Sequence, residues 1–125
     1  EFIGEMNFLS GRAAAREGGL TRIDSAAGPM AGIAAEQLVA GQAVRLAVRP
    51  EHVRIDRDER EGLAGALTHT VFNGANLAML IALSDGSSIR ADVPSSSALA
   101  ALTPGASLFV SWSPESAHVF RDAAA

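Results

Sequence analysis

The densest group of chemically active side chains is the charged run from Arg54 to Gly62, which reads RIDRDEREG. Its carboxylates could in principle hold a cation, because hard cations prefer oxygen ligands. They are Asp56, Asp58, Glu59 and Glu61. Three arginines are interleaved with them and would repel a cation. The alternating charge signs therefore favour a solvated loop or hairpin over a metal site.

The three histidines, His52, His69 and His118, lie far apart in the sequence and show no spacing typical of zinc ligands. His69 shares the parity of an apolar strand face, where we expect it to form part of a barrel wall. His52 and His118 each follow a Pro-Glu pair, and we expect both to be exposed. Convergence of the three on one zinc ion is the alternative, but the pattern favours no metal site.

Several groups that enzymes use are missing from the chain. It contains no lysine, which excludes a P-loop and a Schiff-base nucleophile. It also has no cysteine and no tyrosine, so there is no thiolate and no phenolic acid or base. The serines at residues 95–97 do not sit in a Gly-x-Ser-x-Gly elbow, and they suit the cap of a short helix better. We therefore expect no catalytic residue, metal or cofactor in this chain.

Composition indicates one small domain, which we take as residues 1–125. Apolar residues make up 48% of the chain, but many are alanines with little area to bury, so a partner surface would help. The net charge is −4, and the ten basic residues are all arginines that form no cluster. A nucleic-acid-binding barrel needs a basic groove with stacking aromatic side chains, so we disfavour nucleic acid as a partner.

The ends of the chain and its hydropathy bear on location. No apolar run reaches the roughly 20 residues of a membrane-spanning helix, and no signal peptide is visible. The absence of cysteine fits a reducing compartment. The chain starts at Glu1 and is at once apolar at Phe2 and Ile3, as if it began inside a structural element. We interpret it as a piece of a longer protein.

The stretch VRLAVRPEHVRI, residues 44–55, contains a change of register. Val44, Leu46 and Val48 alternate with polar or small residues, and so do Val53 and Ile55. The first set is even-numbered and the second odd-numbered, so one uninterrupted strand cannot bury both on one face. We predict that Pro50 ends the first strand and bulges the chain at a barrel corner, after which a second strand starts with shifted parity.

The rest of the chain is dominated by short strands and turns. Asn73-Gly74 and Asp85-Gly86 predict tight turns between alternating strands. One short helix is expected in SSSALAALTPG, from Ser95 to Gly105, because a serine can cap it and Pro-Gly stops it. The predicted fold is all-β: an OB-like small β-barrel with additional strands and one short helix. The predicted strands lie at residues 2–9, 20–23, 43–49, 53–55, 63–71, 77–83, 89–93, 108–112 and 117–120, with an undecided segment at residues 31–39.

The order of these motifs resembles a known family. VRPEHVRI resembles the Arg-Pro-Glu motif of the C-terminal TOBE (transport-associated OB) domain of importer-type ABC transporter ATPases. FIGEMNFLSG is similar to the segment that begins this region after the ATPase domain. VFNGANLAMLIALSDG and LTPGASLFVSWSPESAHVF resemble its later strands and final Pro-Glu turn. The likeness covers Phe2 to Phe120.

The resemblance implies a regulatory and dimerisation domain that lacks its own nucleotide-binding domain. The full-length parent would be a cytoplasmic ATPase dimer at the inner face of the plasma membrane, using ATP and magnesium and bound to permease subunits. The tryptophan at Trp112, in VSW, is similar to the residue at this position in the spermidine/putrescine and iron(III) branch of the family. Sugar importers, which tend to have another residue there, are the alternative. The transported substrate would be held by other subunits.

A second hypothesis is an oxyanion-binding domain, because related TOBE domains bind molybdate-like anions at subunit interfaces. Asn7, Leu9 and Gly11 echo their motif, but Gly4-Glu5-Met6 replaces the usual Ser-Ala-Arg. Glu5 would repel an anion unless it were neutralised.

The exposed side chains around Pro50 also have two interpretations. Arg49 and Glu51 could simply hold a corner by local pairing. Alternatively, Arg49, Glu51 and His52 could face a second copy or the ATPase domain, since the arginine fork binds carboxylates in a bidentate manner.

Overall fold

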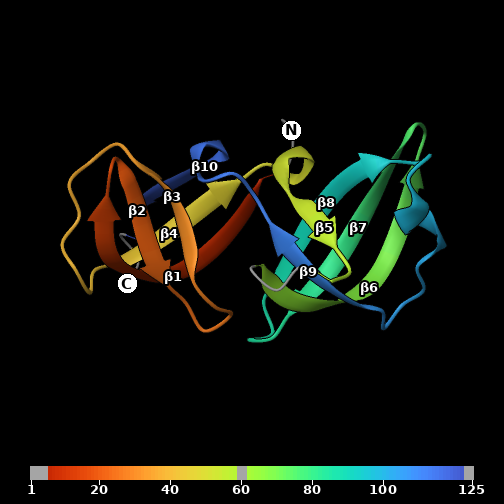
Figure 1. Ribbon diagram of the computed structural model, residues 1–125, viewed down its shortest axis with the longest axis horizontal. Helices are drawn as coiled ribbons and strands as arrows, with labels where there is room; N and C mark the ends of the chain where they lie inside the picture. Colours follow the sequence, from red (N-terminus) through yellow and green to blue (C-terminus); the bar gives the residue numbers. More distant parts are fainter. Residues whose placement is uncertain (1–5, 59–61, 123–125) are drawn as a thin grey trace.

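A computed structural model describes residues 6–58 and 62–122 and shows an all-β molecule of two lobes lying side by side (Figure 1). Three single-turn 3-10 segments are the only helical elements within the described residues. The elements are β1 (Asn7–Glu17), β2 (Leu20–Asp24), β3 (Met30–Ala34), β4 (Ala43–Val48), η1 (Pro50–His52), β5 (Arg54–Asp56), β6 (Leu63–Asn73), β7 (Asn76–Leu83), β8 (Ser88–Pro94), η2 (Ala98–Ala101), β9 (Ser107–Ser111), η3 (Pro114–Ser116) and β10 (Ala117–Arg121).

The first lobe is a closed five-stranded barrel in the order β1-β2-β3-β10-β4. Its pairs are antiparallel except for β3 and β10, which run parallel. Alternation places Val44, Leu46 and Val48 of β4 inside, each at most 1% exposed. The predicted small barrel is confirmed, and it is closed by the last strand of the chain returning between β3 and β4.

The additional strands form a second lobe inserted between β4 and β10. It is an antiparallel sheet in the order β5-β9-β6-β7-β8 (Figure 1). The period-two pattern of β7 buries Leu77, Met79, Ile81 and Leu83 at 4% exposure or less. One continuous cluster of buried side chains runs through both lobes.

Several local predictions are confirmed. Asn73-Gly74 and Asp85-Gly86 form the turns of two hairpins. Gly86 has φ of 89°, a backbone conformation that favours glycine. The helix expected from Ser95 to Gly105 shrinks to η2, where the Ser97 hydroxyl accepts a hydrogen bond from the Leu99 amide at 3.1 Å.

The prediction for His69 was wrong. A β-bulge interrupts the pairing of β6 with β7 between Leu67 and His69. The bulge shifts the parity of the strand, so Leu67 is buried while His69 and Val71 are exposed. The apolar set read from the sequence as one face is therefore split between two faces.

The register change at Pro50 is real, but its mechanism differs from the prediction. Residues 50–52 form a 3-10 turn and not a bulge. The strands on either side belong to different lobes, β4 to the barrel and β5 to the second sheet. The parity shift thus marks the point where the chain leaves one lobe for the other.

Candidate interaction site at the double crossover

The chain passes between the lobes twice, and both passages contain the same kind of turn. Residues 49–53 connect β4 to β5, and residues 112–116 connect β9 to β10. Each contains a Pro-Glu pair at the start of a 3-10 turn, Pro50-Glu51 in η1 and Pro114-Glu115 in η3. We call these two segments the double crossover. Proline fixes its own φ and lacks an N–H, which suits the first position of such a turn.

The two passages run in opposite directions between one antiparallel ladder in the barrel and another in the second sheet. Val48 pairs with Ala117 on the barrel side, and six residues further along Arg54 pairs with Ser111 on the sheet side. The two passages therefore have the same length, and the pairing register of the barrel ladder continues in that of the second sheet. The Arg54 guanidinium also donates to the Ser113 hydroxyl at 3.3 Å.

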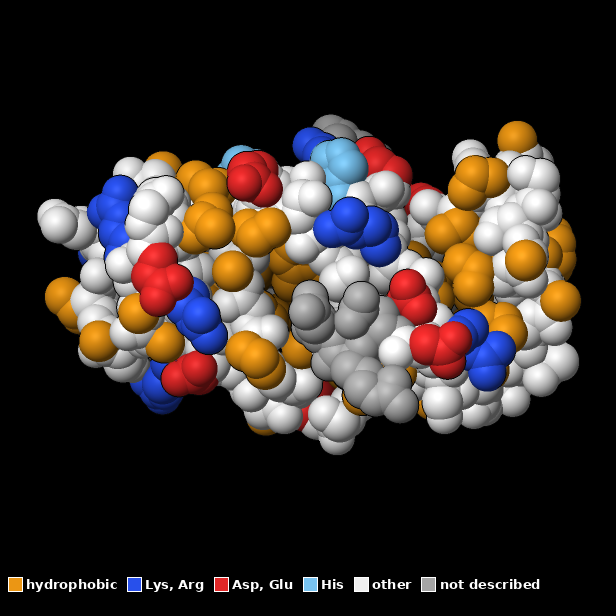
Figure 2. Space-filling view, in the orientation of Figure 1, with side chains coloured by type: hydrophobic (Ala, Val, Ile, Leu, Met, Phe, Trp, Pro, Cys, Tyr) orange, Lys and Arg blue, Asp and Glu red, His pale blue; other side chains and the backbone are white. Residues whose placement is uncertain are grey.

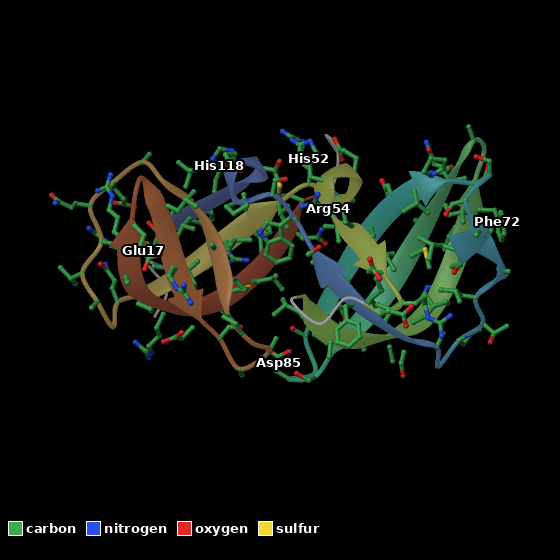
Figure 3. All side chains as sticks on the ribbon, viewed as in Figure 1. Glu17, His52, Arg54, Phe72, Asp85 and His118 are labelled. Carbon is green, nitrogen blue, oxygen red and sulfur yellow. The ribbon has the colours of Figure 1, made fainter. Side chains whose placement is uncertain are left out.

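The residues singled out from the sequence all lie on the double crossover. Arg49, Glu51 and His52 are exposed, whereas Pro50 is buried beneath them. Among the residues that the structure describes, neither Arg49 nor Glu51 forms an ion pair. His52 and His118 lie along the same upper margin of the molecule in Figure 3. This margin is a polar surface open to a partner.

Asn7 fastens the barrel to the second sheet. Its side-chain nitrogen donates to the Arg90 carbonyl oxygen at 2.9 Å, and its side-chain oxygen accepts from the Arg90 amide at 2.8 Å. Arg90 is on β8, the edge of the second sheet, so one carboxamide takes the place of a neighbouring strand there. Asn7 is 8% exposed, and its bonds satisfy a buried polar group. The sequence signal was a polar residue at an inward position of β1.

Trp112 fastens the lobes from the other side. It is 9% exposed, and its indole Nε1 donates to the Ala31 carbonyl oxygen of β3 at 3.2 Å. Val53, also buried, lies on the opposite passage of the double crossover. Next to Trp112 is an interlobe cleft of about 330 Å³, lined in part by Leu20, Met30, Leu63 and Val110.

An aromatic cluster on the outside of the barrel was not anticipated. Phe8, which is 46% exposed, meets Phe120 edge-to-face with ring centroids 6.3 Å apart. The Arg45 guanidinium carbon lies 4.5 Å from the centre of the Phe8 ring, within cation–π range. The neighbouring strands β1, β4 and β10 supply one residue each.

The residues that echoed an oxyanion motif have structural roles. Both polar groups of the Asn7 amide are bonded to Arg90, and Leu9 lies in the core. A side chain at Gly11 would collide with Ile23. Glu5 lies outside the described residues, as do Glu59 and Glu61 of the charged run.

Two further features of the described residues concern metal binding and membranes. No three histidine or acidic side chains come close enough together there to hold a metal ion. None of the helices described is long and apolar enough to cross a membrane.

The family of this chain follows from its match to a family model. The model of the TOBE domain matches residues 46–120, from the middle of β4 through the second sheet to β10. This chain belongs to the TOBE domain family. The matched region contains both Pro-Glu passages, so the double crossover lies inside this TOBE domain.

Two curated relatives extend the likeness over the whole chain. The spermidine/putrescine import ATP-binding protein PotA of Ruegeria pomeroyi is 32% identical over 123 residues, 98% of this chain and 33% of the relative. The protein of the same name from Rubrobacter xylanophilus is 30% identical over 115 residues, 90% of this chain and 30% of the relative. This TOBE domain therefore spans about a third of the length of the curated relatives it matches.

A solved structure shares the two-lobed fold. The cytoplasmic molybdate-binding protein ModG, with molybdate bound, superimposes with a TM-score of 0.81 over 93% of this chain and 96% of that chain. The sequence identity is 24%, so the likeness concerns the fold. It confirms the predicted OB-like architecture.

Proposed function

We propose that this TOBE domain is the regulatory and dimerisation module of the ATP-binding subunit of an ABC importer, with spermidine or putrescine as the transported substrate. The observation that carries the proposal is the likeness to PotA along 98% of this chain. In the full-length parent, ATP and magnesium bind to the nucleotide-binding domain, which lies outside this chain. The parent works in the cytoplasm at the inner face of the plasma membrane, bound to permease subunits.

The exposed turn at η1 is our candidate contact with the parent's ATPase domain. Arg49, Glu51 and His52 present a guanidinium, a carboxylate and an imidazole on one short rigid turn. The proposal is supported by the start of β1 beside this turn, where Asn7 pairs with Val48.

A domain exchange tests the function. The corresponding segment of Ruegeria pomeroyi PotA is replaced by this chain, and spermidine uptake is measured in cells that lack their own importer. We expect the exchanged protein to support uptake and a protein without any TOBE segment to fail. A TOBE domain from a sugar importer is the control for the substrate branch. Because other subunits hold the substrate, the exchange reports which branch of the family this domain fits. Loss of uptake by a stably folded exchange, with normal uptake for the sugar-importer control, would refute the assignment of this domain to the polyamine branch.

The second candidate is an oxyanion-binding domain, favoured by the fold shared with ModG. Calorimetry with molybdate, tungstate and sulfate on this chain tests it directly. Heat of binding for molybdate and tungstate but not for sulfate supports anion recognition. The absence of heat for all three leaves the importer module as the proposed function.

A further inference from the structure

Two long stretches of the second lobe carry no formal charge. Residues 62–84 and 93–114 contain no Asp, Glu, Lys or Arg, so the ten arginines and fourteen acidic residues all lie elsewhere in the chain. The first stretch forms β6 and β7, and the second runs from the end of β8 through η2 and β9. In Figure 2 the outermost right-hand part of the molecule shows hydrophobic and uncharged side chains.

One edge of β6 is open at this end. β9 pairs with β6 only from Leu63 to Ala66, and the loop residues Gly105 and Ala106 then bond to Leu67. Residues 69–73 pair with β7 on one side, and within the described residues no backbone hydrogen bond reaches them from the other side. We call this free side of residues 69–73 the β6 edge.

The β6 edge carries the largest exposed apolar side chains of its lobe. Val71 is 47% exposed and Phe72 is 67% exposed. Phe72 pairs with Leu77, which is fully buried, so its ring continues the inner face of the sheet past the end of the core. Figure 3 places Phe72 at the extreme end of the lobe, away from the double crossover.

The other edges of this sheet are protected. Asn7 caps β8 at Arg90 with two hydrogen bonds. β5 has only three residues and bears charges at Arg54 and Asp56. Short length and charge are the usual means by which proteins block edge-to-edge pairing, and residues 69–73 have neither a charge nor a proline.

We propose that the β6 edge pairs antiparallel with the β6 edge of a second copy of this chain about a two-fold axis. A two-fold contact brings each surface against itself, so a charged patch would repel its own copy. The β6 edge itself carries no formal charge. Asp92 on β8, in the same cross-strand row as Val71, forms an ion pair with Arg90 at 2.7 Å, so two copies of this chain with its net charge of −4 meet there without strong repulsion. Val71 then packs on one face of the joined sheet and Phe72 on the other, each beside residues of the second copy, and the ladder satisfies the free backbone groups of residues 69–73. The inference gives the surface for the dimerisation in the proposed function and rests on it.

Matched valine variants test the surface. Val39 is 69% exposed in a loop of the barrel lobe and serves as the control for Val71. Light scattering and sedimentation are measured from micromolar to several hundred micromolar chain. We expect the wild type and Val39→Arg to dimerise at high concentration. Val71→Arg lowers the association constant by about tenfold or more, because two buried like charges then face each other.

Cross-linking locates the contact without adding charge. The chain has no cysteine, so a single introduced thiol reports one position. We expect Val71→Cys to form a covalent dimer on oxidation or with a short bis-maleimide, and Val39→Cys to stay monomeric. This pair also decides the matter if Val71→Arg fails to fold.

A wild type that stays monomeric throughout the series overturns the proposal. So does a dimer in which Val71→Cys does not cross-link, or in which the two arginine variants behave alike, since another face would then be in use. Neither result affects the interpretation of the uptake experiment on the exchanged importer. That experiment alone decides the proposed function.

Discussion

At the scale of single residues, Trp112 is the side chain on which the junction depends most. It fills the space beside the double crossover and donates to Ala31 across the lobes. Replacing Trp112 by Ala removes a large buried ring, so we expect a loss of about 3–5 kcal/mol in the free energy of unfolding. Urea denaturation measures this loss.

Trp112→Phe is the control for the ring itself. It keeps most of the apolar contact and loses the hydrogen bond, so we expect it to cost about 1–2 kcal/mol. A loss below about 1 kcal/mol for Trp112→Ala would contradict the anchoring role and would place the ring at the surface.

Asp85 gives a prediction about pH. The Ser87 hydroxyl and then the Ser87 amide donate to its carboxylate, and these bonds lower the pKa of Asp85 below its usual value. The stability from this lowered pKa is present above the pKa of the unfolded chain and is lost as pH falls through the folded pKa. The effect is small because Asp85 is exposed.

Carboxyl NMR titration measures it. We expect Ser87→Ala to raise the pKa of Asp85 toward its usual value and the neighbouring Ser84→Ala to leave it unchanged. Equal pKa values in the wild type and Ser87→Ala would show that the hydroxyl contributes nothing.

Residue roles were predictable from the sequence where they depend on local chemistry. The Ser97 cap and the exposure of His52 and His118 follow from neighbouring residues, and the structure confirms them. The roles of Asn7 and Arg45 depend on strands brought together only by the fold. A single sequence without a register cannot show such contacts.

At the scale of elements, alternation predicted strands well and failed where a strand is irregular. β7 was predicted almost residue for residue, and its burial alternates from Met79 to Leu83. The bulges in β1 and β6 break the alternation, and the run of alanines in β1 has no pattern at all. The parity shift around Pro50 indicated that the strand ends there. Only the topology shows that the chain also passes from one lobe to the other at this point.

Gly65 gives a prediction about the packing of β6 on β7. A Cβ atom there would lie 2.8 Å from Ile81 Cγ2 and 2.9 Å from the carbonyl oxygen of Ala82. We expect Gly65→Ala to cost about 1–3 kcal/mol, because a backbone atom cannot move aside as a side chain does. Ala64→Ser, at the exposed neighbouring position, is the control for β6. Equal stability of the two variants would mean that β7 shifts without strain.

At the scale of the whole molecule, the sequence predicted a barrel with extra strands but not their division into two lobes. The division depends on which strand closes the barrel, and the last strand of the chain does so by pairing with β3 and β4. Such long-range pairing leaves no local signal. The two Pro-Glu pairs were visible in the sequence, and their meaning as matched passages became clear only from the shared register of the two ladders.

The last prediction concerns cooperation between the lobes. They share one buried cluster, two covalent passages and the bridges from Asn7 and Trp112. We therefore expect one thermal transition whose van't Hoff enthalpy equals the calorimetric enthalpy, about 90 kcal/mol near 60 °C for a chain of this length. Asn7→Ala combined with Trp112→Phe weakens both bridges and leaves the two passages in place. That variant should unfold in two steps, each with about half the enthalpy. A wild-type van't Hoff enthalpy near half the calorimetric value would show that the lobes already unfold independently.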